Sequence, residues 1–180
     1  SSTALGTGPI TFTGAGWMVV HNVFYQNNTL TDSGPPTITN NITLNSSFRI
    51  RSWDAPATFS GSFTLANNST FRVDPVHPAL PGFDNGGSLG KPGPLISNPL
   101  IISGNVVESG GSHSLTMNGQ GQGLLILSGT NSYTGGTIST GSLIFANNNA
   151  IPATGTIQAG NLNFNNSSGY VGTAVTTSGY

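Results

Sequence analysis

The strongest constraint on this chain is a set of short β-prone runs that recur at a small, nearly constant spacing. In the second half of the chain, pairs of apolar residues repeat about every 18 to 19 residues: Leu125/Leu127, Leu143/Phe145 and Leu162/Phe164. This period leaves no room for a helix in each repeat, so three short strands joined by bends are expected. Strands this short bury no face alone, so copies must stack above and below one another.

Residues 121–145 show the pattern most clearly. Residues 124–127 alternate as a strand, and 128–131 carry Ser, Gly, Thr and Asn, which favour turns. Gly135 and Gly136 interrupt the chain again before the β-prone run 137–139. Strand, turn, strand, turn and strand are therefore predicted within one repeat.

The motif in this segment reads Gly-x-Gly-x-Leu-x-Leu-Ser-Gly-x-Asn-x-Tyr-Thr-Gly-Gly-Thr, followed by Gly-x-Leu. It is carried by Gly121, Gly123, Leu125, Leu127, Ser128, Gly129, Asn131, Tyr133, Thr134, Gly135, Gly136, Thr137, Gly141 and Leu143. It resembles the autotransporter-associated β-strand repeat, also called the passenger-associated transport repeat. The likeness covers residues 100–165, and before residue 75 only the general character of the sequence is similar. The resemblance implies a right-handed parallel β-solenoid on a secreted or surface-exposed bacterial protein.

An internal repeat is also visible in residues 37–74. The segment 42–51 is echoed by 63–74 at an offset of about 21 to 23 residues, within the range of solenoid repeats. Strand alternation predicts two sets of positions. The inward positions would be Leu44, Phe48, Ile50, Leu65, Phe71 and Val73, and the outward ones Arg49, Arg51, Arg72 and Asp74.

The fold expected from these patterns is all-β, a single right-handed parallel β-helix (β-solenoid) with short strands and one long Pro-rich loop. Its parts would be an N-terminal strand or cap region (1–36), rungs (37–74), the loop (75–99), autotransporter-type rungs (100–166) and a Gly/Ser/Thr-rich end (167–180). Six of the eleven prolines fall in the loop, and proline lacks the N–H that a strand ladder needs. The loop is interpreted as a family-variable insertion, with a functional loop as the alternative.

Composition excludes several classes of protein. Only 5% of residues are charged and four are basic, which argues against nucleic-acid binding. There is no Cys for a disulfide or thiolate metal site, and no apolar run is long enough to span a bilayer. Without an initiating Met or a signal peptide, the chain is expected to be a mature product or an excised piece.

Asn-rich tracts recur along the chain, as at 40–41, 67–68 and 147–149. In stacked rungs, Asn side chains at matching bends are expected to bond to one another as amide ladders. Several tracts also match the N-x-Ser/Thr glycosylation pattern, which such a composition produces by chance.

The few ionisable residues offer little for catalysis. No zinc or calcium spacing is present, and no metal or cofactor is expected. Stacked rungs would bring Asp54 and Asp74 close together, as glycoside hydrolysis requires. Surface ion pairs with Arg51 and Arg72 are the favoured interpretation. Trp53 and Trp17 would stack on sugars or, more commonly, close a rung and pack in the core.

The function expected is a non-catalytic extracellular or bacterial surface rod that self-assembles end to end or serves as a passenger stalk. The predicted self-assembly strand contains Trp17, Val19, Val20, Val23, Phe24 and Tyr25. One alternative is a carbohydrate-binding or polysaccharide-cleaving β-helix with a ligand face of Arg49, Arg51, Trp53, Asp54, Arg72 and Asp74. Another is an adhesin that presents the 75–99 loop. The expected partners are other copies of the chain, or cell-surface or matrix glycans.

Overall fold

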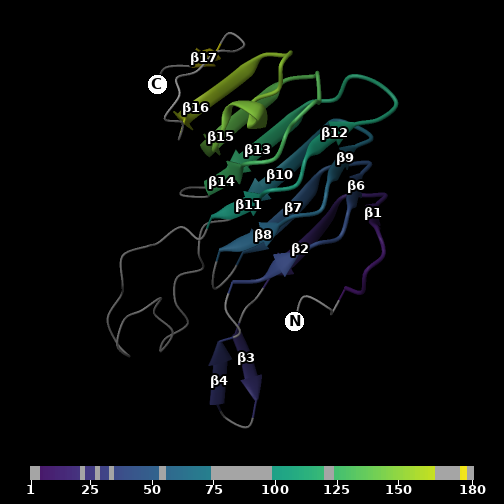
Figure 1. The fold of residues 1–180 in the computed structure, drawn as a ribbon, viewed down its shortest axis with the longest axis vertical. Helices are drawn as coiled ribbons and strands as arrows, with labels where there is room; N and C mark the ends of the chain where they lie inside the picture. The colour runs from purple at the N-terminus through teal and green to yellow at the C-terminus, as the bar shows by residue number, and fades with distance from the viewer. Residues whose placement is uncertain are drawn as a thin grey trace.

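The computed structural model describes residues 5–20, 23–26, 29–32, 35–52, 56–73, 99–119, 124–164 and 175–177. Strands stack above one another with the N-terminal strands at one end and β16 and β17 at the other (Figure 1). One short 3-10 helix, η1 (Asn148–Ala150), is described among them. The predicted 75–99 loop lies outside the described residues except for Pro99.

The parallel strands fall into three columns, and successive strands of the chain occupy them in turn. The first column contains β1 (Ile10–Phe12), β6 (Ile42–Leu44), β9 (Phe63–Leu65) and β12 (Val106–Glu108). The second contains β2 (Gly16–Val20), β7 (Phe48–Ser52), β10 (Ser69–Val73) and β13 (Leu115–Gly119). The third contains β5 (Thr37–Ile38), β8 (Ala57–Phe59), β11 (Leu100–Ile102) and β14 (Leu124–Leu127). We call three successive strands, one from each column, a layer.

Two long strands join the second and third columns. Both β15 (Thr137–Phe145) and β16 (Ile157–Phe164) run through the two columns, with a register shift between Ser139 and Ser142 of β15. β17 (Val175–Thr177) pairs with the first half of β16. The register pairs Leu125 with Leu143 and Leu143 with Leu162. This confirms the repeat positions predicted from the apolar pairs.

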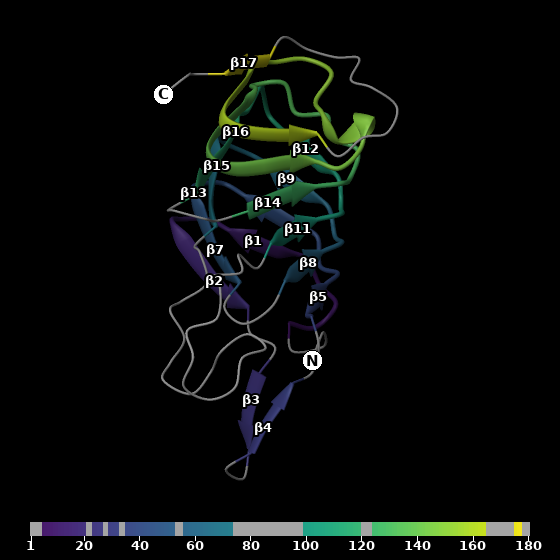
Figure 2. The same ribbon diagram turned by 90° about the vertical axis from the view of Figure 1, so that its left-hand side faces the viewer.

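One hairpin departs from this arrangement. β3 (Val23–Gln26) and β4 (Thr29–Asp32) pair antiparallel with each other and form a separate two-stranded sheet. The hairpin projects beyond the stack near the N-terminal strands (Figure 2). The prediction of an all-β fold with parallel sheets is confirmed and the arrangement is consistent with a β-helix, but the sheets do not form the expected single right-handed helix.

The core follows from strand alternation. In each of the three-residue strands β6, β8, β9 and β11, the first and third residues are buried and the second is half-buried. Five of the predicted inward residues are fully buried: Leu44, Ile50, Leu65, Phe71 and Val73. Phe63 packs edge-to-face with Phe59 and Phe71, at centroid distances of 5.6 and 5.4 Å. The side chain of the sixth, Phe48, is not described.

A column of glycines allows neighbouring layers to approach closely. A Cβ at Gly104 would overlap the carbonyl of Gly61, and a Cβ at Gly129 would overlap the carbonyl of Gly104. Gly61 in turn lies against the backbone of Asn40. Any larger residue at these interior positions would push adjacent layers apart.

Asn41, which lies in one of the predicted tracts, and two further residues, Asn105 and Asn131, bond to backbone groups rather than to another Asn side chain. The Oδ1 atoms of Asn41 and Asn105 accept hydrogen bonds from the backbone N–H groups of Ser62 and Thr130, at 3.0 and 2.9 Å. Asn131 is buried, and its Oδ1 accepts from the N–H of Val106 at 2.9 Å. These side chains therefore satisfy backbone groups of an adjacent layer, which the sequence alone does not specify.

Candidate functional site

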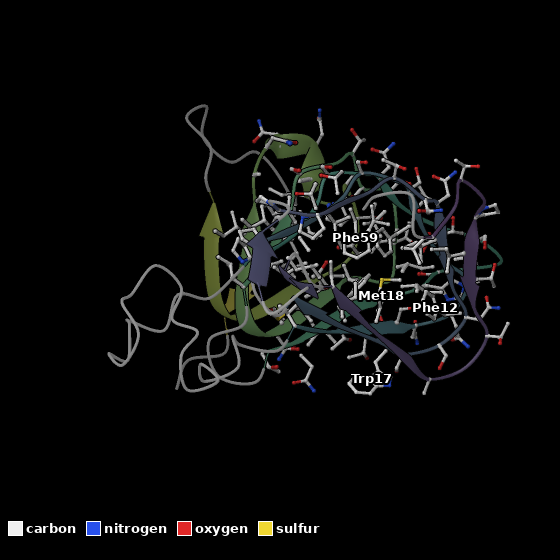
Figure 3. All side chains as sticks on the ribbon, turned by 90° about the horizontal axis from the view of Figure 1, so that it is seen from below. Phe12, Trp17, Met18 and Phe59 are labelled. Atoms are coloured by element: carbon white, nitrogen blue, oxygen red, sulfur yellow. The ribbon has the colours of Figure 1, made fainter. Side chains whose placement is uncertain are left out.

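At the N-terminal end of the stack, the described residues present strand edges and partly buried apolar side chains. β1, β2 and β5 are each the terminal strand of their column. Ile10 and Phe12 of β1 and Met18 of β2 are only partly buried against the core. Seen from below, Phe12 and Met18 point into the stack while Trp17 points away from it (Figure 3). An apolar surface and strand edges therefore meet at this end.

The chain before β1 is attached to the next layer by Asn40. The Nδ2 of Asn40 donates hydrogen bonds to the carbonyls of Gly6 at 3.1 Å and Gly8 at 2.7 Å. Its Oδ1 is buried and has no hydrogen-bond partner, which makes it a costly acceptor within the described residues. This residue was not singled out from the sequence, because nothing local distinguishes it from the other Asn residues.

The predicted self-assembly strand is divided between two elements, so the expectation of one strand from Trp17 to Tyr25 is wrong. Trp17, Val19 and Val20 belong to β2, and Val23, Phe24 and Tyr25 belong to β3. Val20 is buried, whereas 62% of the Trp17 surface is exposed. The expectation that Trp17 packs in the core is also wrong, because its position lies on the outer face of the sheet.

The predicted ligand face is only partly described. Arg49 and Arg51 lie in β7 and Arg72 lies in β10. The strand register places Arg49 beside Arg72. Trp53, Asp54 and Asp74 lie outside the described residues. The predicted approach of Asp54 to Asp74 therefore stays a prediction.

A second polar cluster surrounds Glu108 at the end of β12. Its Oε2 accepts hydrogen bonds from the backbone N–H groups of His113 at 2.8 Å and Thr134 at 3.0 Å. Its Oε1 accepts from the Thr134 hydroxyl at 2.7 Å, and a hydrogen bond of 2.9 Å joins that hydroxyl to the Ser112 hydroxyl. The carboxylate thus links the turn after β12 to the next layer. Glu108 is the chain's one glutamate, which is the signal that would have drawn attention to it.

Two opposing effects set the pKa of Glu108. Desolvation raises the pKa, but the backbone hydrogen bonds from His113 and Thr134, the Thr134 hydroxyl and the nearby His113 ring together lower it below the ordinary value. Glu108 therefore stays ionised to a lower pH than a free carboxyl group.

The cluster lacks the connections of a nucleophilic triad. Glu108 bonds to the backbone of His113, and the Nε2 of His113 lies 3.0 Å from the carbonyl oxygen of Ser109. In a triad the carboxylate would orient the imidazole, and the imidazole would bond to the serine. We interpret the cluster as a structural link between turns.

Tyr133 is another residue whose surroundings the sequence did not reveal. It is fully buried, and its hydroxyl bonds to the hydroxyl of Thr137. Burial raises its pKa, outweighing the opposing effect of that hydrogen bond. Tyr133 therefore offers no exposed ring to a sugar.

Across the ranges listed for the fold, no group of three or more His, Asp or Glu residues is arranged to hold a metal ion. Within those same ranges, no helix has the length and apolar character needed to cross a bilayer. Comparison with family models, curated proteins and solved structures gives no match. The autotransporter likeness accordingly rests on the motif residues alone.

Proposed function

We propose that this chain is an extracellular structural rod, a right-handed parallel β-solenoid whose copies add to one another end to end. The observation that carries the proposal is the N-terminal end of the described stack, where β1, β2 and β5 are the last strands of their columns and Phe12 of β1 and Met18 of β2 are only partly buried. Strand edges with unpaired N–H and C=O groups bind further strands readily.

The solenoid part of the proposal is supported by the order of the strands. The chain visits the three columns in the same order from β5 to β14, and every pairing within the columns is parallel. Right-handed connections are expected because parallel strands joined by crossovers adopt that hand in about 98% of cases. The β3–β4 hairpin is then an excursion from one layer.

The rod assignment is supported by where the chain places its chemistry. The described interior is aliphatic and aromatic, and its polar members bond within the structure, as Asn131 does with Val106 and Ala150. The Glu108 cluster is occupied by hydrogen bonds to its own turns. This arrangement favours a structural role over catalysis, and no cofactor is part of the proposal.

A head-to-tail contact is heterologous, and repetition of such a contact produces an open filament. An extracellular location is proposed from the motif resemblance. The sequence around the motif is also rich in the uncharged residues Gly, Asn, Ser and Thr. The stacked layers would give such a filament stability that sums from one neighbour to the next.

The test is electron microscopy and sedimentation over a concentration series with two matched variants. Phe12→Lys places a charge at the open end, where docking would bury it, and should abolish filaments. Ile138→Lys makes the same chemical change on the outer face, where Ile138 is 41% exposed, and should leave filaments unchanged. Isolated rods of the unaltered chain at every concentration would contradict self-assembly.

A further inference from the structure

Three of the chain's four basic residues lie on two neighbouring strands. Arg49 and Arg51 are in β7 and Arg72 is in β10, whereas the fourth is Lys91. The parallel register pairs Arg49 directly with Arg72. It also pairs Trp17 of β2 with Arg49. An aromatic residue and two cationic residues therefore form one row across three adjacent strands, the Trp17–Arg49–Arg72 row.

This row occupies the outer face of the sheet. Arg49 precedes Ile50 and Arg72 precedes Val73, and both of these apolar residues are fully buried. Because successive positions of a strand belong to opposite faces, the two arginine positions belong to the outer one. Trp17, at the end of the same row, has 62% of its surface exposed.

Such a row brings two positively charged positions side by side. Residues of like charge directly opposite each other on neighbouring strands destabilise a sheet, and adjacent strands are only about 4.8 Å apart. In a chain with only 5% charged residues, few acidic side chains are available to offset that repulsion. An anion at the row would remove it, because the planar guanidinium fork matches carboxylate and sulfate groups.

The third member of the row narrows the class of anion. An exposed indole offers a flat apolar surface, on which the C–H face of a sugar ring packs. The row crosses the strands, so it runs along the stack and suits an extended polymer. The two arginines of the row, in a chain with four basic residues and a net charge of −1, are few for a nucleic acid, whose binding depends on neutralising many phosphates.

We propose that the Trp17–Arg49–Arg72 row binds an acidic polysaccharide. Trp17 receives a sugar ring, and Arg49 and Arg72 bind carboxylate or sulfate groups carried by the same polymer. The row lies on the outer face rather than on the open end, so this binding does not depend on end-to-end assembly.

The test measures the affinity of the full chain for three probes at low salt: polygalacturonate, dextran sulfate and neutral dextran. The two charged polymers should bind and neutral dextran should not. Arg49→Gln and Arg72→Gln should each weaken binding about tenfold or more, as expected for loss of a charge-assisted hydrogen bond. Trp17→Ala should weaken it several-fold, and Trp17→Phe should restore most of it because the flat ring returns.

The control is Lys91→Gln, which removes one positive charge from a residue outside the three strands of the row and should leave binding unchanged. Binding of polygalacturonate would show that the row recognises carboxylate groups. Binding of dextran sulfate alone would show that it recognises sulfate groups. Either outcome supports the site. Circular dichroism distinguishes loss of binding from loss of fold.

Several results would overturn the proposal. Equal affinity for neutral dextran would remove the acidic-sugar assignment, and tighter binding of single-stranded DNA would assign a different polymer. Unchanged binding by both arginine variants would show that the row is not the site, as expected if Asp54 or Asp74 already neutralises it. An effect of Lys91→Gln equal to that of Arg49→Gln would reduce the result to net charge.

Discussion

The first layer and the interior layers use the same sequence pattern but differ in burial. In the first column, Ile-Thr-Phe of β1, Ile-Thr-Leu of β6 and Phe-Thr-Leu of β9 lie in register. Leu44 and Leu65 are fully buried, whereas Phe12 at the equivalent position of β1 is only partly buried. The alternation determines which side chains face inward, and a neighbouring layer on each side determines how much surface they bury.

The largest effect that separates the two regions should come from truncating equivalent inward residues. We expect Leu65→Ala to destabilise the fold by about 2–5 kcal/mol, because it leaves a cavity between two layers. Phe12→Ala should cost only about 1 kcal/mol, because the ring is only partly buried before truncation. Chemical denaturation of dilute monomer measures both. Equal losses would show that the end is as well packed as the interior.

The glycine column gives a second contrast between the interior and the N-terminal end. Gly104→Ala should cost about 1–3 kcal/mol or more, because the new methyl group would overlap the carbonyl of Gly61. Gly14→Ala is the control, since nothing lies within 4 Å of a Cβ built there. Thermal unfolding of the two variants compares them. If Gly104→Ala unfolds like Gly14→Ala, the layers are able to separate at little cost.

Two Asn residues test whether burial also determines how much a hydrogen bond contributes to the free energy of unfolding. Asn131→Ala should cost about 1–3 kcal/mol, because the N–H of Val106 and the carbonyl of Ala150 both lose a partner inside the structure. Asn105→Ala removes an exposed acceptor of the Thr130 N–H, which water can replace, and should cost about 0.5 kcal/mol. The difference in the free energy of unfolding follows from the urea midpoints of the two variants, provided that both show the same dependence on urea concentration.

The smallest expected effect is a pH dependence at Glu108. The lowered pKa means that the folded state binds a proton less readily than the unfolded state. The contribution of Glu108 to stability is therefore complete above the ordinary carboxyl pKa and is lost as the pH falls through the lowered value. Unfolding of Glu108→Gln and the unaltered chain should differ at neutral pH and converge in acid. A constant difference from neutral to acidic pH would show that ionisation of Glu108 is not the cause.

The sequence alone predicted the all-β class, the parallel strands and most of the inward residues, because alternation and a short period are local properties of the chain. Leu44, Leu65 and Phe71 could be assigned to the core for that reason. It also supplied the motif resemblance and the shortage of catalytic groups. Of the candidate site, it selected Trp17, Arg49 and Arg72, but it did not place them in one row.

Only the tertiary structure decided the features that depend on register between layers. It divided residues 17–25 between an edge strand and an antiparallel hairpin, a division that the continuous apolar run does not indicate. It directed Asn131 to backbone groups of adjacent layers and joined Glu108 to Thr134, contacts between residues 19 to 26 positions apart. It also placed Trp17 beside Arg49, because pairing between distant strands is set by how complete layers fit together.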